Sequence, residues 1–138
     1  MKNLFYILIG LVFTLSSCSL DDGKEDVSYE LLPVNQVVMP ESFKANKENP
    51  IEIKFIRPTS CHAFNSFYYD KTGNIRTVAI ESIIYTNNGC EPLTVDNIAV
   101  QTLNFKPETA GEYTFKFWQG KDDNGEDIFL TYDIIVQP

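Results

Sequence analysis

Residue types that catalysis requires are few in this chain. His62 is the only histidine, and it follows Cys61 directly, with Ser60 and Ser66 on either side. Hydrolases of the nucleophile-elbow type place the serine in a glycine-framed turn, and no such turn surrounds either serine. The 19 acidic residues lie mostly in tether and turn positions, so nothing singles out a carboxylate pair for hydrolysis. We expect no catalytic residue and no enzyme activity, with a small carboxylate-dependent hydrolase as the alternative.

Metal ligands are equally sparse. A Cys–His site would use Cys61, His62 and Cys90, but zinc takes three or four ligands and the chain has no second histidine. The acidic run 122–127 offers oxygen ligands for Ca²⁺ but lacks the spacing of an EF-hand loop. We expect a plain hairpin tip at 122–127. His62 is expected to be either hydrogen-bonded within the fold or exposed in a loop. We expect neither a metal nor a cofactor.

Aromatic side chains are better candidates for a binding site. Trp118 and Phe129 share the outward parity of the last two expected strands. One aromatic pair of the third expected strand, either Phe67 with Tyr69 or Phe64 with Tyr68, is also expected to point outward, and we take Tyr69 as the candidate. A sheet face with these three residues would suit sugar stacking or a protein partner. The alternative is that loops or the first strand cover this face.

The first 18 residues have the pattern of an export signal. Lys2 gives a positive start, Leu4 to Leu15 form an apolar segment, and two small serines precede Cys18. As a helix, the apolar segment would be about 18 Å long, too short for a bilayer core of roughly 30 Å. A permanent transmembrane helix is therefore not expected. The alternative is an ordinary secretory signal in which Cys18 is incidental.

The sequence Leu15-Ser16-Ser17-Cys18 resembles the lipobox of bacterial lipoproteins. The resemblance implies that cleavage removes residues 1–17 and that Cys18 receives a diacylglycerol and an N-acyl chain such as palmitate. Several acyl chains hold a protein on a membrane much more firmly than one. Ser19 is not the aspartate that favours inner-membrane retention in some of these proteins. We expect a cell-envelope protein, lipid-anchored in the outer membrane.

Residues 18–26 then form a lipidated acidic tether. This acidic stretch is similar to the acidic export signal that follows the lipid cysteine in some surface-exposed lipoproteins. The alternative is that it is only a solvated tether, and both interpretations can be true. The chain has a net charge of −8, and loss of Lys2 with the signal makes the mature charge more negative by one. Phosphate binding needs a basic surface, so nucleic acid is excluded as a partner. The lipid is the expected membrane contact.

An exported domain with Cys61 and Cys90 is expected to form one disulfide. The rest of the chain, 27–138, is long enough for one domain with one core. Its β-branched and aromatic runs, separated by Gly, Pro, Asn and Asp clusters, predict an all-β fold. We expect seven strands: 28–39, 50–57, 62–69, 74–86, 93–105, 111–119 and 127–137. Pro33 breaks the first strand or marks it as an edge. In the strand 93–105 the apolar residues change from even positions (98 and 100) to odd ones (103 and 105), which predicts a bulge near Gln101.

The last two strands allow a register to be predicted. Asn124-Gly125 is the best two-residue hairpin turn in the chain, and the alternative is an irregular loop over 120–127. With this turn, three apolar pairs face one another: Tyr113 with Val136, Phe115 with Ile134, and Phe117 with Tyr132. On the other face Lys116 lies opposite Asp133, and Trp118 opposite Thr131.

The segment 103–115 resembles the corner between the fifth and sixth strands of immunoglobulin-like domains. Tyr113 takes the place of the corner tyrosine, and Phe115 the place of the second cysteine of antibody domains. The resemblance implies a single seven-stranded antiparallel immunoglobulin-like sandwich, without the antibody disulfide or strand tryptophan. If strands alternate in direction, Cys61, Cys90 and the tether share one end, with loops 40–49, 70–73 and 106–110 at the other.

These patterns together indicate a membrane-anchored lipoprotein of the cell envelope. We expect a non-enzymatic binding or interaction module whose partner is a carbohydrate or an envelope protein, since no residue set specifies a reaction. A sandwich fold alone would not decide between these partners.

Overall fold

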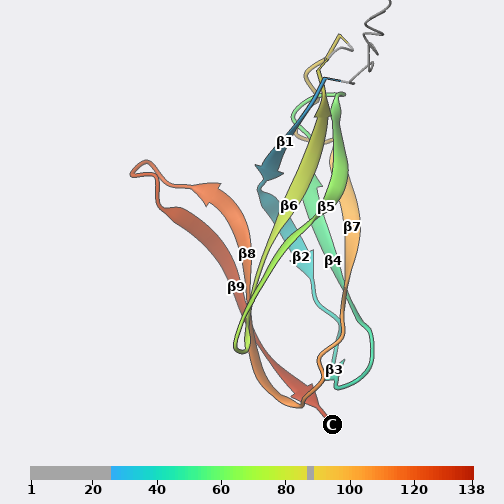
Figure 1. Ribbon diagram of the computed structural model, residues 1–138, viewed down its shortest axis with the longest axis vertical. Helices are drawn as coiled ribbons and strands as arrows, with labels where there is room; N and C mark the ends of the chain where they lie inside the picture. The colour runs from blue at the N-terminus through green and yellow to red at the C-terminus, as the bar shows by residue number, and fades with distance from the viewer. Residues whose placement is uncertain (1–25, 87–88) are drawn as a thin grey trace, which may run out of the picture.

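The computed structural model describes residues 26–86 and 89–138, and all regular structure in them is β-strand (Figure 1). Cys18 and the rest of the expected signal and tether up to residue 25 lie outside the described residues. The strands are β1 (Val27–Leu32), β2 (Val34–Val38), β3 (Phe43–Lys44), β4 (Asn49–Ile56), β5 (His62–Thr72), β6 (Ile75–Tyr85), β7 (Ile98–Phe105), β8 (Gly111–Lys121) and β9 (Asp127–Gln137). Within the described residues no helix is long and apolar enough to cross a membrane.

The strands form two sheets. The small sheet has the order β2-β4-β7, and the large one the order β1-β6-β8-β9-β3, with β5 on the other edge of β6. The pairs β6–β8 and β3–β9 are parallel, so the large sheet is mixed and the expected wholly antiparallel sandwich is wrong in this respect. The edge of β6 is shared, because β8 pairs with Ile75–Val78 and β1 with the part from Ile80 to Tyr85.

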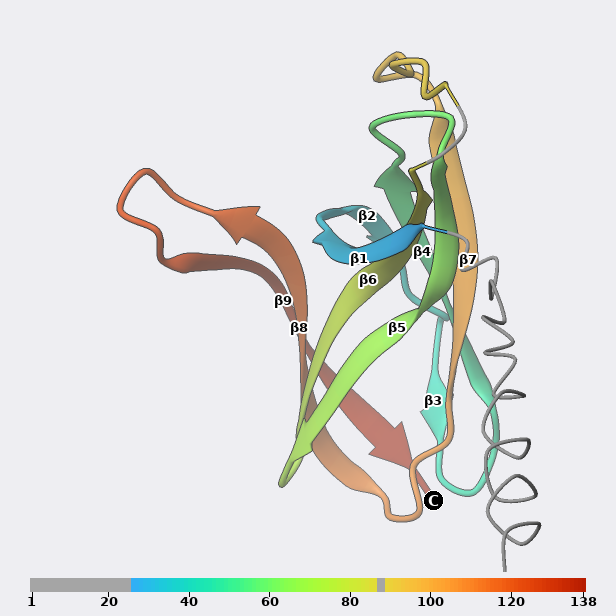
Figure 2. The ribbon, with the colours of Figure 1, turned by 45° about the horizontal axis from the view of Figure 1, so that its top comes forward.

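Pro33 breaks the first expected strand, as predicted. Before it, β1 pairs with β6 in the large sheet; after it, β2 pairs with β4 in the small sheet. Proline has no backbone N–H, so a change of sheet at this residue leaves no N–H donor of its own unpaired. The first segment of the domain thereby links both layers (Figure 2).

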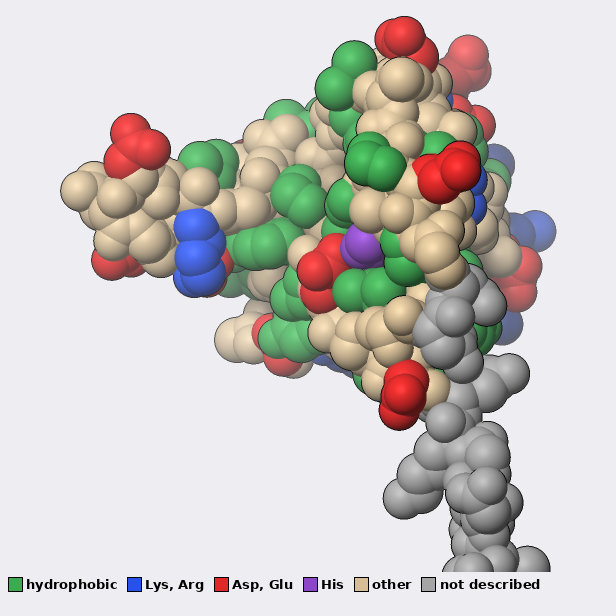
Figure 3. All heavy atoms as spheres, turned by 90° about the horizontal axis from the view of Figure 1, so that it is seen from above, with side chains coloured by type: hydrophobic (Ala, Val, Ile, Leu, Met, Phe, Trp, Pro, Cys, Tyr) green, Lys and Arg blue, Asp and Glu red, His purple; other side chains and the backbone are tan. Residues whose placement is uncertain are grey.

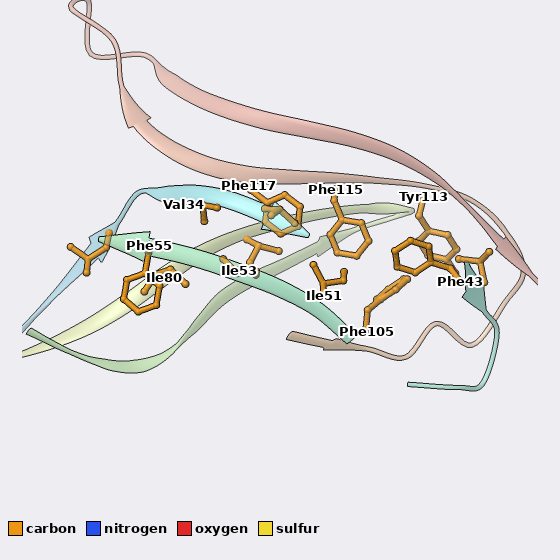
Figure 4. Packing of buried hydrophobic residues seen from close by; sticks show 14 residues of the cluster. Val34, Phe43, Ile51, Ile53, Phe55, Ile80, Phe105, Tyr113, Phe115 and Phe117 are labelled. Atoms are coloured by element: carbon orange, nitrogen blue, oxygen red, sulfur yellow. The ribbon is translucent and has the colours of Figure 1, made fainter. Parts of the chain in front are cut away.

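Alternating side chains of both sheets meet in one core (Figure 4). From β4, Ile51, Ile53 and Phe55 are fully buried, as their predicted inward parity requires. From β8, Phe115 and Phe117 stack with ring centroids 5.6 Å apart. Burial of one such side chain contributes roughly 1.5–3 kcal/mol, so this alternation is the main determinant of the fold.

Tyr113, at the start of β8, makes the hydrogen bond expected of a corner tyrosine. Its hydroxyl donates to the carbonyl of Thr109, at 3.1 Å, and lies 2.9 Å from the Thr109 hydroxyl. The ring itself is buried and packs edge-on against Phe105, with centroids 5.5 Å apart. This interaction fixes the turn between β7 and β8.

The hairpin of β8 and β9 has the predicted strands but a different register. Tyr113 faces Ile134, Phe115 faces Tyr132 and Phe117 faces Leu130, two residues from the predicted partners. The shift arises at a bulge between Trp118 and Lys121 and at a longer turn, in which the Gly125 N–H donates to the Asp122 carbonyl. The inward faces are preserved, because a shift of two residues keeps the parity of every side chain.

Three further expectations about strands need correction. Strand β7 begins at Ile98 instead of residue 93, and it pairs with β4 through Phe105 without a register shift. The expected bulge near Gln101 is therefore wrong: Ile98 and Val100 simply point outward and are half-exposed. The short strand β3, which pairs in parallel with the end of β9, has no counterpart among the expected strands.

The two domain cysteines form the predicted disulfide, with Cα atoms 5.3 Å apart. The Cys61 carbonyl accepts from the N–H of Tyr85, and Tyr85 lies opposite Val27, the first residue of β1. The start of β1 and the bridge therefore share one end, as predicted. At the other end, the Asn46 N–H donates to the Pro107 carbonyl, which brings two of the expected loops together.

Candidate functional site

Trp118 and Phe129 are direct cross-strand neighbours on the outer face of the large sheet. They lie opposite one another in the β8–β9 register, so the predicted partner of Trp118, Thr131, is wrong, whereas the expected outward parity of both aromatics is confirmed. The ammonium group of Lys116 sits 5.8 Å from the centre of the Phe129 ring on the same face. The two aromatic side chains form one wall of a cleft.

The cleft exists because β8 leaves β6 after four paired residues. Parallel pairing ends at Val78 and Phe117, and β1 takes over the edge of β6 from Ile80. Beyond that point the hairpin of β8 and β9 projects away from the body of the domain (Figures 1 and 2). The space between hairpin and body has a volume of about 360 Å³ and is lined by Leu31, Tyr68, Thr77, Ala79, Trp118, Lys121, Asp127 and Phe129. We call it the Trp118 cleft.

Asp127 is the polar centre of the hairpin wall. Its Oδ1 accepts from the indole N–H of Trp118 and from the Lys121 ammonium, both at 2.9 Å. These two hydrogen bonds, the one from Lys121 more than the one from Trp118, lower the pKa of Asp127 from its ordinary value of 3.8. The bond to Asp127 in turn raises the pKa of Lys121 from 10.5. Both groups are therefore charged at neutral pH, and the carboxylate fixes the orientation of the indole ring.

At the hairpin tip beyond the cleft, the Asp122 carboxylate finds its hydrogen-bond donors within the turn itself. The Asp122 carboxylate accepts from the backbone N–H groups of Asn124 and Glu126, at 2.8 and 2.9 Å. These bonds lower its pKa from 3.8. Seen from above, acidic side chains lie at the far end of this arm (Figure 3). The tip is a hairpin turn closed by Asp122 and Glu126, and it is longer than the two-residue turn that was expected.

Tyr68, and not the expected Tyr69, supplies the aromatic group on the opposite wall. A register shift between Phe64 and Ser66 inserts one extra residue in β5 and reverses the facing of every side chain after it. Tyr68 then lies opposite Ala79 on the outer face, and Tyr69 lies opposite the fully buried Val78 on the inner face. Tyr69 lines a different pocket, at the opposite end of the domain from the disulfide. The expected grouping of Tyr69 with Trp118 is therefore corrected. Sequence parity left Tyr68 open as the alternative but could not choose it, because the bulge has no sequence signal.

His62 is buried and fully engaged at the disulfide end. Its Nε2 lies 2.7 Å from the Glu30 carboxylate, and its Nδ1 lies 2.8 Å from the Thr59 hydroxyl. The order of hydroxyl, imidazole and carboxylate is that of a hydrolase triad. The Thr59 hydroxyl also accepts from the Cys61 N–H at 3.3 Å, beside the disulfide. We interpret these bonds as a clamp between β1, the turn before β5 and β5 itself, consistent with the expected satisfied histidine.

No group of three His, Cys, Asp or Glu side chains that could hold a metal ion occurs in residues 26–86 and 89–138. Cys61 and Cys90 are joined to each other, so neither is available as a thiolate ligand. The Trp118 cleft offers a set of aromatic faces, one carboxylate, one ammonium group and the hydroxyls of Tyr68 and Thr77. Aromatic rings stack on the C–H faces of ligands, and the polar groups bond to hydroxyls.

Comparisons with protein-family models, curated proteins and solved structures find no match to this chain.

Proposed function

We propose that this protein is a cell-envelope lipoprotein, lipid-attached at Cys18, whose domain binds carbohydrate in the Trp118 cleft without catalysing a reaction. One observation carries the binding proposal. Trp118, Phe129 and Tyr68 come from three different strands, yet they line one concave site together with Asp127 and Lys121. Sugars combine apolar ring faces with hydroxyl rims, and a site of this composition complements both.

The polar groups of the cleft favour a sugar over a protein partner. A protein-binding face would have an apolar centre with charges confined to its rim. Here the Asp127 carboxylate bonds directly to the indole of Trp118, so charge and aromatic ring lie side by side. The cleft volume of about 360 Å³ is also within the range of small-molecule sites.

A small hydrolase is the alternative function, and the lining of the cleft argues for binding instead. Glycoside hydrolysis uses two carboxyl groups about 5–10 Å apart across the bond that breaks. In the described part of the chain, Asp127 is the one acidic residue that lines the Trp118 cleft. Its depressed pKa also makes it unsuited to act as a proton donor at neutral pH.

The proposed outer-membrane location and surface exposure rest on the lipobox, Ser19 and the acidic tether. They agree with the position of Val27, which starts β1 at the disulfide end and leaves the opposite end free. We also propose that the domain is a variant of the immunoglobulin-like sandwich. The Tyr113–Thr109 bond supports this, although here β5 pairs with β6 and not with β8.

The binding proposal is tested by comparing the chain with its Trp118→Ala variant on a glycan array and in an envelope pull-down. We expect the array to show at least one saccharide ligand, with an affinity that falls about tenfold or more in the variant, because tryptophans at binding sites often contribute 2 kcal/mol or more. Trp118 is the only tryptophan, so quenching of its fluorescence reports occupancy of the cleft directly.

Ile98→Ala is the matched control, because Ile98 is half-exposed on the outer face of the small sheet. It removes an apolar side chain from the other sheet and should leave glycan binding unchanged. Equal glycan binding by the chain and Trp118→Ala would refute the site. Loss of a protein in the pull-down, with no glycan ligand, would instead identify an envelope protein as the partner.

A further inference from the structure

A second pocket opens at the end of the domain opposite the disulfide, on the inner side of the large sheet. Its volume is about 490 Å³, and it is lined by Tyr69, Lys71, Gly73, Asn74, Arg76, Leu103, Asn104, Phe105, Lys106, Pro107, Glu108, Thr109 and Tyr113. The residues come from the β5–β6 turn and from the segment between β7 and β8. We call it the Arg76 pocket, and it shares no lining residue with the Trp118 cleft.

Arg76 is a buried cation at the base of this pocket. It is the second residue of β6, and its inward parity, shared with Val78 and Ile80, leaves only 4% of it exposed. Its Nη1 donates to the carbonyls of Gly73 and Ile75, at 2.7 and 2.8 Å. Its guanidinium carbon lies 5.0 Å from the centre of the Tyr113 ring. All these partners are neutral.

No carboxylate of the described residues neutralises Arg76. The ion pairs in residues 26–86 and 89–138 are Lys54–Glu52, His62–Glu30 and Lys121–Asp127. Tyr69 hydrogen-bonds to the guanidinium, but burial raises the pKa of its phenol, so it stays neutral. An arginine does not lose its proton in proteins, and a buried charge without a counter-ion is costly.

Arg76 lines the pocket, and both of its bonds to carbonyls use Nη1. Neither Nε nor Nη2 donates to a carbonyl or carboxylate within the described residues. No side-chain nitrogen in that part of the chain is both sealed from solvent and unbonded, so a nitrogen of the Nε and Nη2 edge that does not bond to Tyr69 is open to solvent. Two parallel N–H groups of this kind match the two oxygens of a carboxylate or phosphate.

The surroundings reinforce this charge. Lys71 and Lys106 join Arg76 in the lining, against Glu108 as the one acidic residue there. This excess of positive charge stands out in a chain with a net charge of −8. Asn104 and Thr109 add neutral donors at the rim.

We propose that the Arg76 pocket binds an oxyanion group, with the Nε and Nη2 edge of Arg76 as a bidentate donor and Lys71 and Lys106 as flanking cations. The ligand carries a carboxylate or a phosphate, and its remaining atoms occupy the space beside Tyr69. This site is distinct from the proposed carbohydrate cleft, and each can fail without the other.

The test is a titration of the full chain, in a neutral-headgroup detergent at low ionic strength, followed by NMR of the Arg76 Nε–H signal. The probes are glucuronate, inorganic phosphate and, as the uncharged control, glucose. We expect saturable shifts of the Arg76 signal with glucuronate or phosphate and none with glucose. Saturation by glucuronate alone identifies a carboxylate ligand, and saturation by phosphate alone identifies a phosphate ligand.

Rim variants keep the test decisive even if replacement of Arg76 unfolds the chain. Lys71→Gln and Lys106→Gln should each raise the dissociation constant of the bound anion about threefold to tenfold, because each removes a flanking positive charge. Lys54→Gln, which lies on β4 in the other sheet, removes the same charge and should have no effect.

The proposal is overturned if neither anion gives a saturable shift, or if the three lysine variants bind alike. Inorganic phosphate should not change the fluorescence of Trp118, and a negative result at Arg76 leaves the proposal for the Trp118 cleft unaffected.

Discussion

The disulfide gives a prediction whose size follows from the structure. Cys61 and Cys90 are 29 residues apart, and bridging them restricts a loop of about that length in the unfolded chain. The chain-entropy relation for about 30 residues gives roughly 12 cal/mol/K, or about 3.6 kcal/mol at 25 °C. Replacing both cysteines by alanine should therefore lower the free energy of unfolding by about 3–4 kcal/mol.

Equilibrium unfolding in urea measures this loss, with far-UV circular dichroism and Trp118 fluorescence as independent probes. Coincident transitions would justify a two-state treatment. The m-value should increase in the double variant, because an unbridged chain exposes more surface when it unfolds. Thiol-blocking mass spectrometry of the purified chain should find both cysteines unmodified before reduction.

Reduced wild-type protein is the matched control, since it lacks the crosslink but keeps both sulfur atoms. Cys61 is buried, with 6% of its surface exposed, so alanine also removes some packing there. The reduced protein should therefore be slightly more stable than the double variant. A loss below about 1 kcal/mol in the reduced protein would refute the argument from chain entropy.

Three smaller perturbations test other parts of the structure. Tyr113→Phe removes the hydroxyl that donates to the Thr109 carbonyl, and urea unfolding should show a loss of about 0.5–1.5 kcal/mol; a loss near zero would contradict the role of this bond. Gly125 has φ of 84°, so Gly125→Ala should destabilise by about 1–2 kcal/mol, measured in the same way; a stabilised variant would show that the turn rearranges. The pKa of Asp127 is depressed below 3.8, so its bond to Trp118 is present above that pH and is lost as the pH falls through the lowered value; Trp118 fluorescence should thus stay constant from pH 7 to about 5, and a transition within that range would contradict the assignment.

The parts of the fold that follow from side-chain alternation were predictable. In the middle of β4 and of β8 every second residue is apolar, and these residues lie in the core. Pro33 was identified as a break because proline lacks a donor, and Tyr113 as a corner because of its place before Phe115. These features depend on local sequence, which a single chain contains in full.

What could not be predicted depends on distant contacts. The bulge in β5, between Phe64 and Ser66, decides which of Tyr68 and Tyr69 faces outward, yet nothing in residues 62–72 marks its position. The register of β8 and β9 is set by a bulge and a longer turn, because Gly120, with φ of 104°, allows the strand to bend before Asn124. Parallel pairing of β6 with β8 brings together segments that are far apart in sequence, so the Trp118 cleft has no local signature.

The split of the first strand at Pro33 has a mechanical consequence. A pull on Val27 along β1 would load the hydrogen bonds between β1 and β6 together, because these bonds lie perpendicular to the strands. Beyond Pro33 the same segment continues as β2 in the other sheet, so the force would pass into both layers and not peel one from the other. With the chain held at Cys18 as we propose, a load on the bound ligand would be resisted in shear, the direction in which paired strands are strongest.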